Sequence, residues 1–163
     1  MSILTDIAQR VKVVLEGVEL SQKFDLHRNY GDWEDKLADF DKLLRIDVVP
    51  QSCQSTLFDR GAIRYECRIS ILLRKRIFPQ DRKEGRIDPA IIDQLVGDLE
   101  TVHEYFVPSQ PGQNGLLLPS GYTRHANWLE GAIKAPYSRK LLKEGQYSGW
   151  CEVVFGYSST PGA

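Results

Sequence analysis

Residues 62–76 read AIRYECRISILLRKR, and this stretch decides the fold. From Ile63 to Leu73, apolar residues and one cysteine occupy every second position, while charged or polar residues fill most positions between them. Successive side chains of a strand point to opposite faces, so the alternation predicts an antiparallel strand with one solvated face. At ~3.3 Å per residue it extends for about 50 Å, whereas strands usually have roughly five or six residues. We therefore expect it either to bend at a bulge or to project from the domain at its far end.

Three further segments have the character of strands. Apolar and polar residues alternate over 24–30 and over 151–157, and residues 44–49 are mostly apolar. Proline cannot donate a hydrogen bond to a ladder, so Pro50 is expected to end the second strand or to lie at an edge. The polar residues 51–56 then form the turn or loop that follows.

Two long helices are predicted on either side of these strands. Apolar residues recur at helical spacing from Ile3 to Val18, and Ser2 or Thr5 is available as the N-cap. The second helix begins at Asp88-Pro89, which supply an N-cap and a proline at the first helical position. Its apolar stripe continues to Phe106.

The remaining segments are less regular. Trp33, Leu37 and Phe40 are spaced by four and three residues, which predicts a short helix. Residues 108–122 contain three prolines and three glycines, and a loop of this length in a compact domain is usually functional or disordered. Residues 128–133 form a short element whose type the pattern leaves open.

The composition favours a single core. Of the 163 residues, 42% are hydrophobic and 26% are charged, which is ordinary for one globular domain. The order of elements predicts an α+β domain over residues 1–157, with a mainly antiparallel sheet, two long helices on one face, and long loops. Residues 158–163 are expected to form a flexible C-terminal tail.

Charge, hydropathy and cysteine content exclude several classes of protein. The net charge of −1 argues against a dedicated nucleic-acid-binding protein, which needs clustered excess lysine and arginine. No signal peptide and no membrane span are expected, because no apolar run approaches the ~20 residues that cross a bilayer. The cysteines at positions 53, 67 and 151 fit neither a disulfide framework nor a zinc motif. They are interpreted as reduced thiols in a cytosolic setting.

The sequence lacks the common catalytic and cofactor motifs. It has no P-loop, dinucleotide fingerprint, GxSxG elbow, HExxH motif or EF-hand loop. His27, His103 and His125 share no spacing that would place two of them on one metal. Cys67 and Cys151 lie in the apolar phase of their strands, where cysteine packs as a small hydrophobe. We therefore expect no enzymatic activity, no metal and no cofactor.

Two segments are candidate contact surfaces. The segment 74–86 is basic and is either a solvated connection or an electrostatic surface that faces a partner or DNA. Its candidate interface residues are Arg74, Lys75, Arg76, Arg82, Lys83 and Arg86. The apolar residues Leu116, Leu117 and Leu118 either fold back onto the core or dock on a neighbouring chain.

Short motifs spread over nearly the whole chain carry a family resemblance. They are Leu4-Thr5-Asp6-Ile7-Ala8, Arg28-Asn29-Tyr30, the run from Leu44 to Val49 with Pro50-Gln51-Ser52, Arg64-Tyr65-Glu66, Leu73-Arg74-Lys75, the helix from Ile87 to Phe106, Pro136-Tyr137, and Glu152-Val153-Val154-Phe155. Together with the order of elements, these motifs resemble the small neck and tail-completion proteins of tailed bacteriophages. Within that group the chain is most similar to tail terminators at the head-tail junction.

The resemblance implies a structural virion protein, made in the cytoplasm of the bacterial host. Tail terminators form hexameric rings that cap the tail tube and meet the head connector. The implied partners are therefore further copies of the chain, a tail-tube protein, and a connector or stopper protein, with genomic DNA passing through the ring. No catalytic residue, membrane contact or small-molecule substrate is implied. Residues 108–122 and 127–144 depart from the family plan by their greater length.

Other functions remain open on the sequence alone. One is another neck or minor tail component. A different class is a small-ligand-binding protein or an enzyme that uses a pocket near His27, Tyr30 and Trp33, since polar and aromatic residues often line pockets. An adaptor that binds host nucleic acid is disfavoured by the charge balance.

Overall fold

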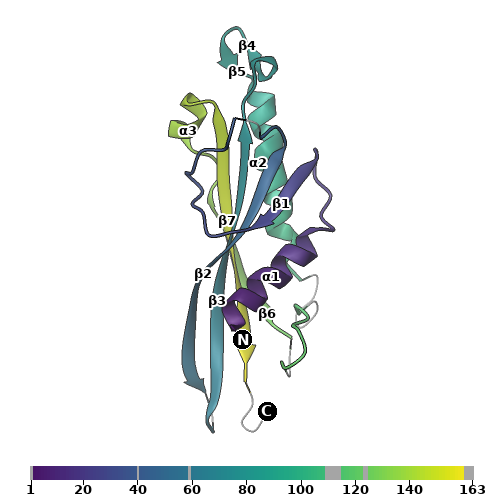
Figure 1. The fold of residues 1–163 in the computed structure, drawn as a ribbon, viewed down its shortest axis with the longest axis vertical. Helices are drawn as coiled ribbons and strands as arrows, with labels where there is room; N and C mark the ends of the chain where they lie inside the picture. Colours follow the sequence, from purple (N-terminus) through teal and green to yellow (C-terminus); the bar gives the residue numbers. More distant parts are fainter. Residues whose placement is uncertain (1, 40, 59, 109–114, 123–124, 160–163) are drawn as a thin grey trace.

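The computed structural model describes residues 2–39, 41–58, 60–108, 115–122 and 125–159. The elements follow in the order α1 (Ile3–Leu15), β1 (Phe24–Arg28), β2 (Leu44–Phe58), β3 (Ala62–Arg76), the 3-10 helix η1 (Pro79–Asp81), β4 (Arg82–Lys83), β5 (Arg86–Ile87), α2 (Pro89–Tyr105), β6 (Asn127–Ala135), α3 (Arg139–Lys143) and β7 (Gln146–Ser158). Five of the strands form one twisted sheet, and β4 and β5 form a separate small hairpin (Figure 1).

The large sheet has the strand order β1-β2-β3-β7-β6. β1 pairs with β2 in parallel, whereas the other ladders of this sheet are antiparallel. β3 is the predicted long strand with the predicted bounds, and it is central because β2 and β7 pair with it on opposite sides. The α+β class and the mainly antiparallel sheet are therefore confirmed.

Both long helices lie on one face of the sheet, as the sequence predicts. Ser2 caps α1 by accepting a hydrogen bond from the Thr5 amide, and Asp88 caps α2 by accepting one from the Ala90 amide. Their apolar stripes pack with the inward-facing side chains of β2, β3 and β7 in one core. Fully buried residues at the centre of this core are Ile7, Val11, Leu15, Ile46, Ile69, Ile71, Leu95, Leu99, Cys151 and Val153.

A connection covers part of the opposite face of the sheet. The connection between β1 and β2, of which the structure describes residues 29–39 and 41–43 and which we call the 29–43 connection, passes over the ends of β3 and β7 (Figure 1). Polar side chains of those strands bind its backbone. Gln146 accepts a hydrogen bond from the Leu37 amide at 2.8 Å and donates one to the Asp35 carbonyl at 3.0 Å. The Ser148 hydroxyl donates to the Trp33 carbonyl. One half of the sheet is thus covered on both faces.

Three expectations about the elements are wrong. Residues 33–39 form turns and irregular backbone instead of a helix, with Phe40 outside the described residues. The expected turn or loop at 51–56 is instead part of β2, which continues to Phe58 after a register shift between Pro50 and Ser52. Pro50 itself lies at an edge, the second of its two expected positions, because β1 pairs with β2 only as far as Val48. Ser158 and Ser159 do not belong to a loose tail, because Ser158 lies in β7 and the Ser159 amide donates to the Ile63 carbonyl.

The element at 128–133, whose type the sequence left open, is the strand β6. Parts of the predicted loop and tail, residues 109–114 and 160–163, lie outside the described residues. α3 was not predicted. It is a single short turn with Ser138 as N-cap, and its length is below that at which an apolar repeat becomes visible in a sequence.

The molecule is elongated along the strands (Figure 1). At one end, β2 and β3 extend past α1 to their connecting turn, and at the other end η1 and the β4–β5 hairpin extend past α2. The expectation that the long strand bends at a bulge or projects at its basic end is therefore wrong: β3 pairs regularly with β7 from Arg64 to Arg76, and it is the start of β3, together with β2, that extends beyond α1.

Candidate functional site

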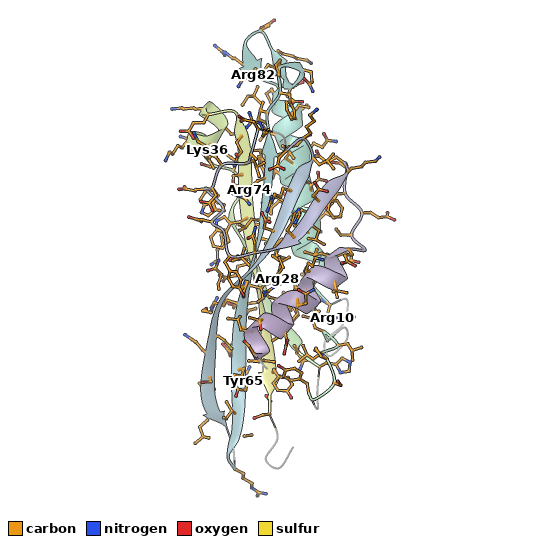
Figure 2. The ribbon with its side chains drawn as sticks, in the orientation of Figure 1. Arg10, Arg28, Lys36, Tyr65, Arg74 and Arg82 are labelled. Atoms are coloured by element: carbon orange, nitrogen blue, oxygen red, sulfur yellow. The ribbon has the colours of Figure 1, made fainter. Side chains whose placement is uncertain are left out.

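The basic segment 74–86 divides into a buried part and an exposed part (Figure 2). Arg74 was predicted to lie on a projecting arm, but only 4% of its surface is exposed, because residues 29–43 cover it. Its guanidinium forms an ion pair with Asp47, which is fully buried, and donates to the Asp35 carbonyl at 3.1 Å. The assignment of Arg74 to an exposed interface is therefore wrong.

The Asp47 carboxylate is the centre of a polar network inside the domain. Besides Arg74, it accepts hydrogen bonds from Asn29 Nδ2 at 2.7 Å and from Arg45 Nε at 3.1 Å. A buried carboxylate without such partners would be strongly unfavourable. The network therefore fixes the 29–43 connection to β2 and β3, and its role is structural.

The other basic residues are at least partly exposed. Lys75 is half-buried, and Arg76 Nη1 lies 2.9 Å from the carboxylate of Asp39 at the rim of the covered half. Arg82, Lys83 and Arg86 are exposed on the β4–β5 hairpin, with Arg82 near the tip in Figure 2. Lys83 pairs with Asp88 at 3.5 Å. The hairpin therefore presents a small cationic surface at one end of the molecule.

The leucine segment folds back onto the core. Leu116 is 5% exposed and Leu118 8%, and Leu116 forms an isolated antiparallel bridge with Ala126. Leu117 points outward, is 58% exposed, and borders a crevice of about 340 Å³ against α1. Leu116 and Leu118 therefore fold back onto the core, which was the first of the two expected alternatives. Within this segment, Leu117 alone is exposed enough to contact a neighbouring chain.

A cleft on the connection side of the sheet was not predicted as such. Its volume is about 270 Å³, and it lies between residues 31–33 and the strands β2, β3 and β7. Trp33 and Trp150 line it with ring centroids 6.5 Å apart, and Leu72 contributes apolar surface. Trp33 was among the residues proposed for a pocket, whereas His27 and Tyr30 do not line this cleft. Tyr30 instead packs against Arg28, whose guanidinium carbon lies 5.3 Å from the centre of the Tyr30 ring.

The polar residues of the cleft differ in how well they are paired. Arg68 Nη1 lies 2.8 Å from Glu152 Oε1 and 3.5 Å from Glu130 Oε1, so this guanidinium is held in place. The Ser70 hydroxyl is fully buried and has no hydrogen-bond partner among the described residues. A buried hydroxyl without a partner costs about 1–3 kcal/mol. The Ser70 hydroxyl therefore lies behind the cleft wall as an unpaired group, which a ligand reaches only when the side chains over it move.

The two core cysteines are protonated thiols at neutral pH. Burial, reinforced by a hydrogen bond with Cys53, raises the pKa of Cys67 far above its ordinary value. Burial likewise raises the pKa of Cys151 to about 12. A nucleophilic cysteine needs the thiolate form in an accessible and electropositive setting. Both residues serve the core instead, as their place in the strand pattern predicts.

Metal-ligand and membrane features were also sought in the structure. Across the described residues, no group of three or more His, Cys, Asp or Glu side chains could hold a metal ion. Within the same residues, no helix is long and apolar enough to span a membrane. In comparisons with known proteins, no family model and no curated protein matches this chain.

Proposed function

We propose that this chain is an assembly subunit of a tailed bacteriophage virion, a tail terminator or tail-completion protein. Several copies form a ring at the head-proximal end of the tail tube, the ring gives the tube a defined end, and it joins the tube to the head connector. The proposal draws its viral context from the sequence resemblance. Its physical support comes from the way the chain uses its surface.

The observation that carries the proposal is the exposure at the two ends of the molecule. The β4–β5 hairpin has no buried residue, and residues 51–57 of β2 are exposed apart from the half-buried Cys53. An isolated two-stranded hairpin is marginally stable by itself, and of the residues in β4 and β5 only Ile87 packs against the core. Elements of this kind gain most when a second protein covers them, and a ring brings different patches of one subunit together.

Mass measurement tests the proposal directly. The purified chain, alone and mixed with tail-tube subunits, is examined by native mass spectrometry, and purified virions are examined for the chain by peptide mass spectrometry. We expect a closed oligomer, six copies by analogy with the family, and a few copies in each virion. A chain that stays monomeric both alone and with tail-tube subunits, and that is missing from virions, would overturn the proposal.

A second candidate function follows from the tryptophan cleft, namely the binding of a small planar molecule. The favouring observation is the combination of two indole rings with the unpaired hydroxyl of Ser70, because ligand sites pair apolar walls with a few convergent polar groups. A thermal-shift screen of aromatic and heteroaromatic compounds tests it, with Ser70→Ala as the matched variant. A hit that S70A weakens supports a ligand site, and a screen without hits on either protein rejects it.

A further inference from the structure

The sheet has two edges without a strand partner among the described residues. β1 pairs with β2 only as far as Val48, so the outer side of β2 from Val49 onward faces no other strand. On the opposite side of the sheet, β6 pairs only with β7. Free edges present unpaired backbone amides and carbonyls, and proteins normally protect them with charges, prolines or bulges.

The two edges differ in their protection. β6 carries Glu130 and Lys134 and has register shifts between Trp128 and Glu130 and between Ile133 and Ala135, which limit the stretch that can pair. Between the shifts, residues 130–133 keep a regular register with β7, so this stretch can still accept another strand. From Gln51 to Leu57 the β2 edge contains no charged residue, and beyond the register shift at Gln51 its pairing with β3 is regular. Leu57, near its end, is 81% exposed. The β2 edge is therefore open to pairing with another strand.

The registers place the two edges at the same level of the sheet. Ser52 pairs with Arg68, Arg68 with Val154, and Val154 with Glu130, so one row of residues runs from the β2 edge to the β6 edge. Their side chains share one face, and Arg68 contacts Glu130. The two strands also run antiparallel to each other, since three antiparallel ladders separate them. A rotated copy placed beside the first can thus add its β6 to β2 as one more antiparallel ladder.

We propose that neighbouring copies join by pairing the Gln51–Leu57 edge of β2 with the β6 edge of the next copy. The contact is heterologous, since two different edges meet, and repetition closes a ring with a continuous sheet. The occupant of the β2 edge is a second copy because the same chain supplies a level and antiparallel free edge. The inference rests on the proposed ring for its closure, while the pairing itself is tested separately.

Disulfide trapping tests the pairing. In a Cys53→Ser background, Ser52→Cys and Glu130→Cys are made singly and together, and the proteins are oxidised under mild conditions. The double variant is expected to give a ladder of covalent multimers on non-reducing gels, while each single variant stays largely monomeric on the gel. A ladder with Gln54→Cys in place of Ser52→Cys supports the same pairing with a two-residue stagger.

Two other outcomes overturn the inference and are distinguishable from failure of the ring. Oligomers seen by native mass spectrometry without any covalent ladder show that the ring exists but uses another interface. Strong dimer formation by Ser55→Cys alone shows that β2 pairs with β2 of a second copy about a two-fold axis. A chain that is monomeric by native mass spectrometry removes the ring and the pairing together.

A charge test uses a matched control. Gln54→Lys with Thr56→Lys puts two cations on the open edge, and Gln94→Lys with Thr101→Lys makes the same changes on the exposed side of α2. The edge variant is expected to weaken assembly at least tenfold with an unchanged melting temperature, and the helix variant to assemble as the unmodified chain does. Equal assembly of the two variants counts against the edge.

Discussion

The two halves of β2 have opposite surroundings within one continuous strand. From Leu44 to Pro50, all residues but the half-buried Arg45 are buried, with helices on one side and the 29–43 connection on the other. From Gln51 to Leu57, all residues but Cys53 are exposed. The register shift after Pro50 marks the boundary. Strand pairing alone therefore does not determine how much a residue of β2 contributes to stability. The residues of the first half are buried in the core, whereas most of those in the second half are exposed to solvent.

The largest effect is expected in the covered half. Ile71→Ala removes a fully buried side chain between the helices and the sheet, and should lower the free energy of unfolding by about 2–5 kcal/mol through lost burial and a residual cavity. Leu57→Ala, at the exposed end of the same hairpin, is the control and should change stability by less than about 0.5 kcal/mol. Denaturant unfolding of the two variants measures the contrast. Similar losses for both would remove the distinction between the halves.

The buried ion pair gives the next largest effect. Arg74→Ala should destabilise by about 3 kcal/mol, at the low end of the range for a broken buried pair, because Arg45 and Asn29 still contact Asp47. Arg74→Met with Asp47→Leu removes both charges and should recover much of the loss. Thermal or urea unfolding of the single and double variants checks this. If R74A unfolds like the unmodified protein, the Asp47 network does not contribute to stability.

An effect of intermediate size is expected at alkaline pH, where ionisation of the buried Cys151 thiol opposes folding. Because the folded chain raises the pKa of Cys151 to about 12, whereas an unfolded thiol ionises near ~8.5, unfolding releases a proton above about pH 8.5. Stability from this group is complete below that pH and is lost as pH rises towards 12, by up to about 1.4 kcal/mol per pH unit. Cys151→Ala should make the decline between pH 8.5 and 10 shallower, measured by urea unfolding. Val153→Ala, which removes a buried side chain of the same strand that does not titrate, is the control and should lower stability by a similar amount at every pH.

The smallest effect is expected at the β4–β5 hairpin. Arg82→Ser with Arg86→Ser should change the free energy of unfolding by less than about 0.5 kcal/mol, since exposed charges contribute little to stability. If the hairpin is a partner surface, the same variant weakens assembly with the tail tube or connector at low salt and less so at high salt. Light scattering over a salt series measures this. An unchanged salt response would make the hairpin a solvated connection.

The sequence predicted the regular elements well where local chemistry determines them. The Asp88-Pro89 start of α2 and the alternation in β3 appear at the predicted positions, because caps and strand periodicity are local properties. Pro50 misled the strand assignment because its effect depends on which neighbour a strand has at that point. The 33–39 segment misled the helix assignment because Trp33 and Leu37 pack on the far face of the sheet instead of along one helix side.

The candidate surfaces were predicted less well, because burial depends on distant segments. Arg74 lies on the polar phase of β3, and only the folded connection shows that this phase is covered. A usable signal was present in Asp47, a carboxylate inside an apolar strand that requires a cationic partner. The tryptophan cleft combines residues 33, 70 and 150 from three segments, so no local spacing could indicate it.

The position of β7 beside β3 has a consequence for how the chain folds. β2 and β3 are joined by a tight turn and can pair early, whereas Ile71 must wait for Cys151, which follows about eighty residues later. Such distant pairing slows folding, because loop-closure entropy is lost before the contacts form. During synthesis, the central strand therefore keeps one side unpaired until β7 leaves the ribosome. In that interval the nascent chain is most exposed to premature association with other copies.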